Sequence, residues 1–148
     1  MLFRSKKPLS IFEFPLKTWE EFVAIKLLAD LAEILQVEDL LHCTFHPLRN
    51  LARATMPEER FHAQFGEDFS AELIKTAEGK ARLQAAVNEY WPYLPKFFGG
   101  SKSRNNEIFR KWKIKQRTND EMREDYVKRA TEVAAKYGLT LPKLAEAA

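Results

Sequence analysis

The sequence predicts an all-α protein, and three observations support that prediction. Apolar residues recur at helical spacing, and no stretch shows the alternation of a half-buried strand. Two tetrapeptides, Thr-Trp-Glu-Glu at 18–21 and Thr-Asn-Asp-Glu at 118–121, are capping boxes, which stand at helix N-termini. Hydrophobic residues make up 45% and charged residues 30% of the 148-residue chain, as in a globular domain.

Five helical segments are expected along the chain. The first begins after Thr18 and ends about Gln36, and the second spans about 48–75. A third covers about 81–93 and is interrupted by a stretch that contains Pro and Gly at 92–100. A short fourth helix covers about 105–115. The last runs from 119 to 137, because Gly138 suits the residue after a helix and Pro142 follows soon after.

Composition and charge exclude several classes. No apolar run approaches the roughly 20 residues that span a bilayer, and the N-terminus lacks the apolar region of a secretory signal. The single Cys43 fits a reducing compartment and is interpreted as a small buried hydrophobe. These features predict a cytoplasmic protein that contacts no membrane.

The positive charge is unevenly distributed. The net charge is +3, but residues 96–117 hold eight Lys or Arg against one acid, Glu107. Such a cluster can meet nucleic acid, a phosphorylated ligand or an acidic partner, although a solvated helix face is the commonest explanation. We expect no nucleic-acid partner here.

Three polar residues interrupt apolar stripes. Glu59 and His62 are three residues apart, so both leave one face of the second helix, and Asp30 lies on the apolar face of the first. Unpaired buried carboxylates are unfavourable, so these side chains need a common partner, and a cation is the simplest one. The alternative is a hydrogen-bonded cluster with Arg49 or Arg53.

Geometry permits the three residues to meet. If the first two helices are antiparallel, residues 30 and 59 lie level when the turn is centred near residues 44 and 45. Pro47 follows that turn directly, and Pro favours the first turn of a helix. His42 and His46 lie in the same turn, where polar residues are expected anyway. Five aromatic residues further on are interpreted as a packing patch or interface: Tyr90, Trp91, Tyr93, Phe97 and Phe98.

The chain carries Glu58-Glu59-Arg60-Phe61-His62 and, further on, Gly138-Leu139-Thr140-Leu141-Pro142. With several shorter stretches, these motifs resemble the phenylacetic acid catabolic protein family. The family members that the chain resembles are catalytic subunits. The resemblance covers nearly all of this chain after about residue 9, but only the C-terminal half of such a subunit. The matching stretches, in the family's order, are Ser10-Ile11-Phe12, Pro15, Thr18-Trp19, Asp30, Glu58-Glu59-Arg60-Phe61-His62, Trp91-Pro92, Phe98-Gly99, Trp112, Ile114-Lys115, Asn119-Asp120-Glu121, Arg123 and Gly138-Leu139-Thr140-Leu141-Pro142.

The resemblance implies a ferritin-like four-helix core that binds two irons. Each helix pair of that core supplies a carboxylate and a Glu-x-x-His, and the second set maps onto Asp30, Glu59 and His62. The first set has nowhere to map, so residues 1–148 are expected to form a single partial domain. Its parts are residues 1–9, non-native or disordered, residues 10–78, the metal-bearing helix pair, and residues 79–148, the C-terminal helices. Pro57 departs from this pattern, because it should kink or restart the metal-bearing helix, with Thr55 as N-cap and Glu58 at N3.

The resemblance also implies a function. The intact enzyme is a di-iron monooxygenase that epoxidises the aromatic ring of phenylacetyl-CoA or a related aryl-CoA thioester in aromatic catabolism. Its partners are other subunits, including a structural ferritin-like one, and a reductase. Because this chain holds half a site, three interpretations compete: a truncated subunit, a half-length protein that completes the site as a homodimer, and a non-catalytic scaffold subunit.

Overall fold

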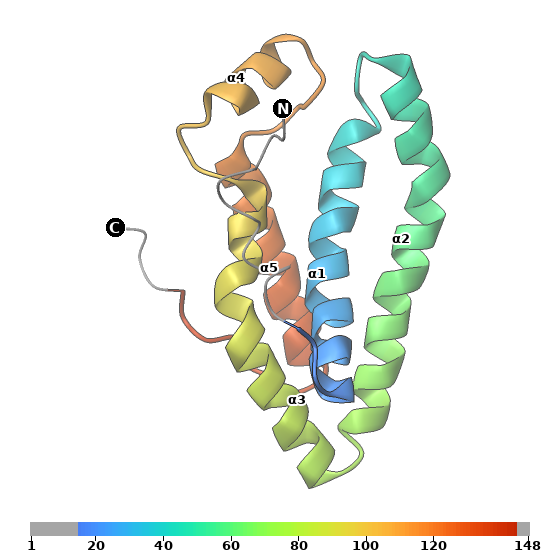
Figure 1. The fold of residues 1–148 in the computed structure, drawn as a ribbon, viewed down its shortest axis with the longest axis vertical. Helices are drawn as coiled ribbons and strands as arrows, with labels where there is room; N and C mark the ends of the chain where they lie inside the picture. Colours follow the sequence, from blue (N-terminus) through green and yellow to red (C-terminus); the bar gives the residue numbers. More distant parts are fainter. Residues whose placement is uncertain (1–14, 145–148) are drawn as a thin grey trace, which may run out of the picture.

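The computed structural model describes residues 15–144, so the expectation for residues 1–9 and the Ser10-Ile11-Phe12 stretch lie outside the described residues. The described part is helical and holds no strand, which confirms the all-α class. Figure 1 shows its elements: α1 (Trp19–Leu40), α2 (His46–Leu73), α3 (Ala77–Tyr90), the 3-10 helix η2 (Trp91–Phe98), α4 (Arg104–Lys111) and α5 (Asn119–Lys136).

Both expected capping boxes are present. The Thr18 hydroxyl accepts the Glu21 N–H at 3.2 Å, and the Thr118 hydroxyl accepts the Glu121 N–H at 3.1 Å. After α5 the chain turns at Gly138, whose φ of +63° is a left-handed conformation that glycine adopts freely. Local signals therefore set these helix ends, as the sequence predicted.

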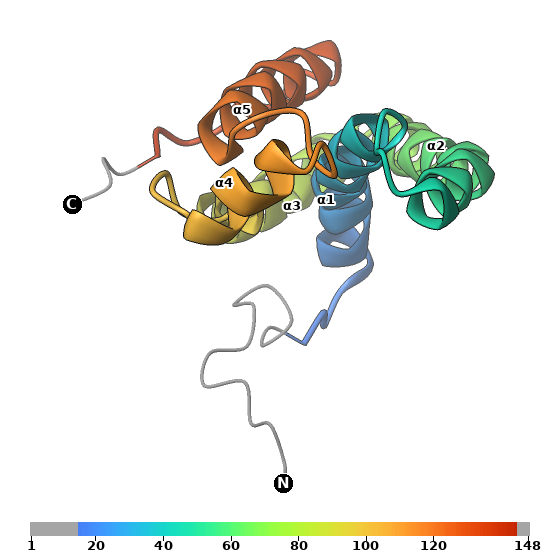
Figure 2. The same cartoon turned by 90° about the horizontal axis from the view of Figure 1, so that it is seen from above.

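Helix α1 is the centre of the bundle. One side of it packs on α2, and the other packs on α3, η2 and α5 (Figures 1 and 2). The core lies on the α3–α5 side, where the Tyr126 hydroxyl donates to the Leu28 carbonyl at 3.0 Å and the Trp91 indole N–H to the Pro142 carbonyl at 3.0 Å. The largest fully buried apolar side chains are Val23, Leu28, Leu35, Leu83, Val87, Trp91, Met122 and Tyr126.

The expected restart of the helix at Pro57 is wrong. Helix α2 continues from His46 to Leu73, and the Thr55 hydroxyl donates back to the Leu51 carbonyl at 3.1 Å instead of capping a new helix. Because proline has no N–H, the Arg53 carbonyl, four residues earlier, loses its helical donor. Both Arg53 and Pro57 are exposed. Water can therefore reach that carbonyl, and the helix tolerates the proline.

Replacing this proline should stabilise the protein. Pro57→Ala restores one backbone hydrogen bond and removes a ring clash, so we expect the free energy of unfolding to rise by about 2 kcal/mol. Urea denaturation followed by circular dichroism measures the change. Pro47→Ala is the matched control, because Pro47 lies in the first turn of α2, where no helical hydrogen bond is lost. An equal or negative change for Pro57→Ala would contradict the prediction.

Candidate metal centre

The structure brings the three predicted residues to one flank of the α1–α2 pair. The two helices are antiparallel and joined by a turn at residues 41–45. Asp30 is buried, whereas Glu59 and His62 are half-buried. His62 Nδ1 lies 4.0 Å from Glu59 Oε2, and the pKa of Asp30 responds to the charges of both His62 and Glu59.

Lys26, one helical turn before Asp30, is the cation nearest to that carboxylate. Its Nζ lies 3.0 Å from Asp30 Oδ2 and donates to Oδ1 at 3.4 Å. Burial raises the pKa of Asp30, and the ammonium of Lys26 opposes that shift. No hydrogen bond or ion pair joins Arg49 or Arg53 to Asp30, Glu59 or His62 within the described chain, so the proposed arginine cluster is not observed.

Glu33 is a fourth member of the site that sequence reasoning missed. It lies three residues after Asp30, so the two carboxylates leave adjacent parts of the same helix face. The pKa of Glu33 is raised to about 7, chiefly because its carboxyl is buried. Its hydrogen bond with the Glu59 carboxyl and the negative charge of Asp30 raise the pKa further. Its i,i+3 spacing from Asp30 was the signal available in the sequence.

An aromatic cluster borders the polar residues at one end. Trp19 stacks on Phe22 at 5.5 Å between ring centroids, and its edge meets Phe69 at 4.9 Å. Phe65, three residues after His62, contacts Phe69 at 4.3 Å. The cluster is open to solvent on one side, because Trp19 is 45% exposed.

The chemistry of these residues fits a transition metal, but the donor set is incomplete. Carboxylates and a neutral imidazole are ligands that iron and manganese accept. Asp30 Oδ2 and Glu59 Oε2 are buried and make no hydrogen bond, although Lys26 lies near the first. Yet across residues 15–144 no three His, Cys, Asp or Glu side chains lie close enough together to hold one ion. The flank therefore offers donor atoms without surrounding a metal position.

The weaker candidates take structural positions. His42 is exposed in the inter-helix turn, His46 is exposed as the first residue of α2, and Cys43 is fully buried as expected. Tyr90, Trp91 and Phe98 lie in the core, which confirms the packing interpretation of that aromatic stretch. No helix within residues 15–144 is long and apolar enough to cross a membrane.

Fold and site together define a ferritin-like helical bundle with a carboxylate–histidine flank. The sequence profile described as Phenylacetic acid catabolic protein matches residues 3–148, and the chain belongs to this family. It is 31% identical, over 136 residues, to the A component of the 1,2-phenylacetyl-CoA epoxidase of Escherichia coli (strain K12). The match covers 90% of this chain and 44% of that relative, so the chain spans less than half the relative's length.

Proposed function

We propose that this chain acts as part of a di-iron monooxygenase that epoxidises the aromatic ring of phenylacetyl-CoA or a related aryl-CoA thioester. Family membership and the similarity to an epoxidase component support this assignment. The observation on which it depends most is the juxtaposition of Asp30, Glu59 and His62 on one flank of α1 and α2. Other subunits and a reductase would be its partners in the cytoplasm.

Each side chain has a distinct role in this proposal. Glu59 and His62 would hold one iron between them from α2, and Asp30 would bind it from α1. When bound, iron would supply the activation of dioxygen that ring epoxidation requires. The Lys26 ammonium neutralises Asp30 in the free protein, and Glu33 adds a further carboxylate beside Glu59.

The incomplete donor set favours a site that is finished by further protein. A second copy related by a two-fold axis could contribute an equal set of donors, which is the homodimer alternative. The scaffold alternative instead leaves the flank without metal, with Lys26 as its permanent cation. Metal content measured together with oligomeric state separates these possibilities.

Iron binding should depend on the α2 motif. We expect the purified protein to bind Fe(II) under anaerobic conditions, and Glu59→Ala or His62→Ala to weaken binding by at least about 100-fold, because each removes a ligand. Isothermal titration calorimetry and elemental analysis measure affinity and stoichiometry, and light scattering measures mass. Glu58→Ala is the matched control, since Glu58 neighbours Glu59 on α2 but is exposed.

Three outcomes discriminate the candidates. Binding that accompanies dimerisation supports the homodimer, and binding by a monomer supports a single subunit with its own half-site. A metal-free monomer would exclude the homodimer, and an equal loss of affinity in Glu58→Ala and Glu59→Ala would contradict the metal assignment and favour the scaffold.

A further inference from the structure

Helix α4 and the turn after it present an exposed apolar surface at one end of the bundle. Ile108, Phe109 and Trp112 are 41%, 43% and 67% exposed. Phe45, in the α1–α2 turn, is 57% exposed. Large apolar side chains this accessible are uncommon on a monomer when they gather, and they often mark an interface.

The turn before α2 lies directly beside the end of α4. The Thr44 N–H donates to the Lys113 carbonyl at 3.0 Å, and the Thr44 hydroxyl donates to the Trp112 carbonyl at 2.7 Å. These bonds join segments nearly 70 residues apart in sequence. We call the exposed group Phe45, Ile108, Phe109, Arg110, Lys111, Trp112 and Lys113 the α4 surface.

The charge on the α4 surface is uncompensated. Arg110, Lys111 and Lys113 form no ion pair with any residue of the described chain, although the longer-range attraction of Arg110 contributes to the lowered pKa of Glu121. Arg117, in contrast, is paired with Asp39 and Asp125 in the interior. The α4 surface therefore combines exposed rings with free cations.

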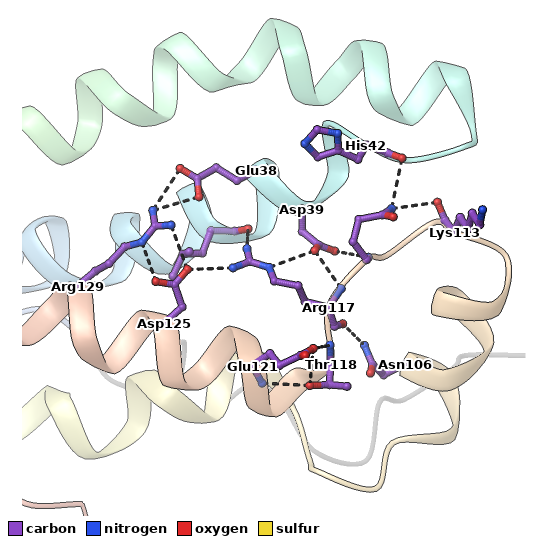
Figure 3. Close-up of polar contacts among 12 residues, drawn as sticks. Glu38, Asp39, His42, Asn106, Lys113, Arg117, Thr118, Glu121, Asp125 and Arg129 are labelled. Carbon is purple, nitrogen blue, oxygen red and sulfur yellow. Dashed lines mark hydrogen bonds and ion pairs between the residues drawn. The ribbon is translucent and has the colours of Figure 1, made fainter.

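A polar network holds this surface in place. The Asp39 carboxylate accepts the backbone N–H groups of Gln116 and Arg117 at 2.9 and 3.2 Å, and the Gln116 side chain donates to the carbonyls of His42 and Lys113 (Figure 3). Lys113 itself has a φ of +53°, which a residue with a Cβ rarely adopts. A surface fixed in this way loses little conformational entropy when a partner binds.

We propose that the α4 surface docks an acidic face of another subunit of the same organism's epoxidase. This inference rests on the proposed function, because it names a partner of that assembly. Trp and Arg are the residues most enriched at binding hot spots, and unpaired cations select an acidic counterpart. A nucleic acid would use the charges and rings but gain nothing from Ile108, so a protein fits the surface better.

The test measures binding of the purified chain to each remaining purified subunit of that epoxidase. Biolayer interferometry at about 50 and about 500 mM salt varies the screening length about threefold. We expect an acidic partner to bind more weakly at high salt, and Trp112→Ala to weaken binding about 30-fold. The double variant Lys111→Glu, Lys113→Glu should weaken binding and reduce its salt dependence.

Matched controls lie away from the α4 surface. Phe61 on α2 is 68% exposed, almost equal to Trp112, so Phe61→Ala tests loss of an exposed ring elsewhere. Lys128→Glu reverses a charge on α5. We expect both to leave the affinity unchanged, and circular dichroism checks that every variant remains folded.

Several results would overturn the proposal. They are no binding to any of the other subunits, equal losses in Trp112→Ala and Phe61→Ala, or tighter binding of a single-stranded RNA than of any protein partner through Trp112 and Lys113. Iron binding at Glu59 and His62 is measured separately and does not involve α4. A failure of docking is therefore distinguishable from a failure of the proposed function.

Discussion

Gly66→Ala is expected to lower the free energy of unfolding by about 3 kcal/mol, because the α1 backbone lies directly against α2 at this residue. A Cβ built on Gly66 would lie 2.5 Å from the Leu27 nitrogen, 2.6 Å from the Lys26 carbonyl carbon and 2.8 Å from the Leu27 Cα. All three atoms belong to the α1 backbone, so no side-chain rotation relieves the overlap. The two helices must separate.

Urea denaturation measures the effect of Gly66→Ala, and Gly100→Ala is its control. A Cβ on Gly100 would meet no atom within 4 Å, so its change should stay within about 0.5 kcal/mol. Because Gly66 lies one helical turn after His62, we also expect Gly66→Ala to weaken iron binding by moving the α2 ligands away from Asp30. Equal stability of the two alanine variants would show that the close approach is not required.

Asp39→Ala should also cost about 3 kcal/mol of stability, because it removes a buried charge that several donors share. The Asp39 side chain is 1% exposed and forms an ion pair with Arg117, whose Nε lies 3.3 Å from Oδ1. Two backbone N–H groups, of Gln116 and Arg117, also donate to it. The alanine variant leaves these donors without their acceptor, and the loop that connects α4 to α5 keeps only the hydrogen bond from the Arg117 guanidinium to the Leu35 carbonyl as a direct bond to α1.

The control for Asp39→Ala is Glu72→Ala. Glu72, in α2, forms an ion pair with Lys75, in the turn that follows α2. Both side chains are more than 60% exposed. Exposed pairs contribute little, so the change should be about 0.5 kcal/mol or less. If Asp39→Ala destabilised the protein no more than Glu72→Ala, the network in Figure 3 would not anchor the loop.

Local sequence signals predicted most of the helices. The capping boxes at Thr18 and Thr118 and the glycine at 138 act within one turn of the chain, so their effect can be read without knowledge of the fold. The expectation at Pro57 was wrong for the opposite reason. Whether a helix tolerates proline depends on solvent access to the freed carbonyl, and packing decides that access.

The candidate site divides in the same way. The spacing of Glu59 and His62 places them on one face of any helix, and the short turn between two long helices brings Asp30 level with them. Lys26 and Glu33 escaped notice because both are ordinary charged residues in the sequence. Their spacing from Asp30, i,i+4 and i,i+3 within α1, is visible in the sequence, but only the packing of α2 on that flank partly buries them and brings Glu33 beside Glu59.

The sequence by itself determined the all-α class, the N-terminal ends of α1 and α5, and the three residues that resemble family ligands. It placed the end of α1 at about Gln36 and the start of α3 at about residue 81, whereas α1 ends at Leu40 and α3 begins at Ala77. Tertiary structure alone decided that α1 is buried on two sides, that Asp39 holds the α4–α5 loop, and that the metal flank lacks a complete donor set within residues 15–144. The physical reason is range. Capping and helical periodicity act over a few residues, whereas burial and charge pairing join segments far apart in the chain.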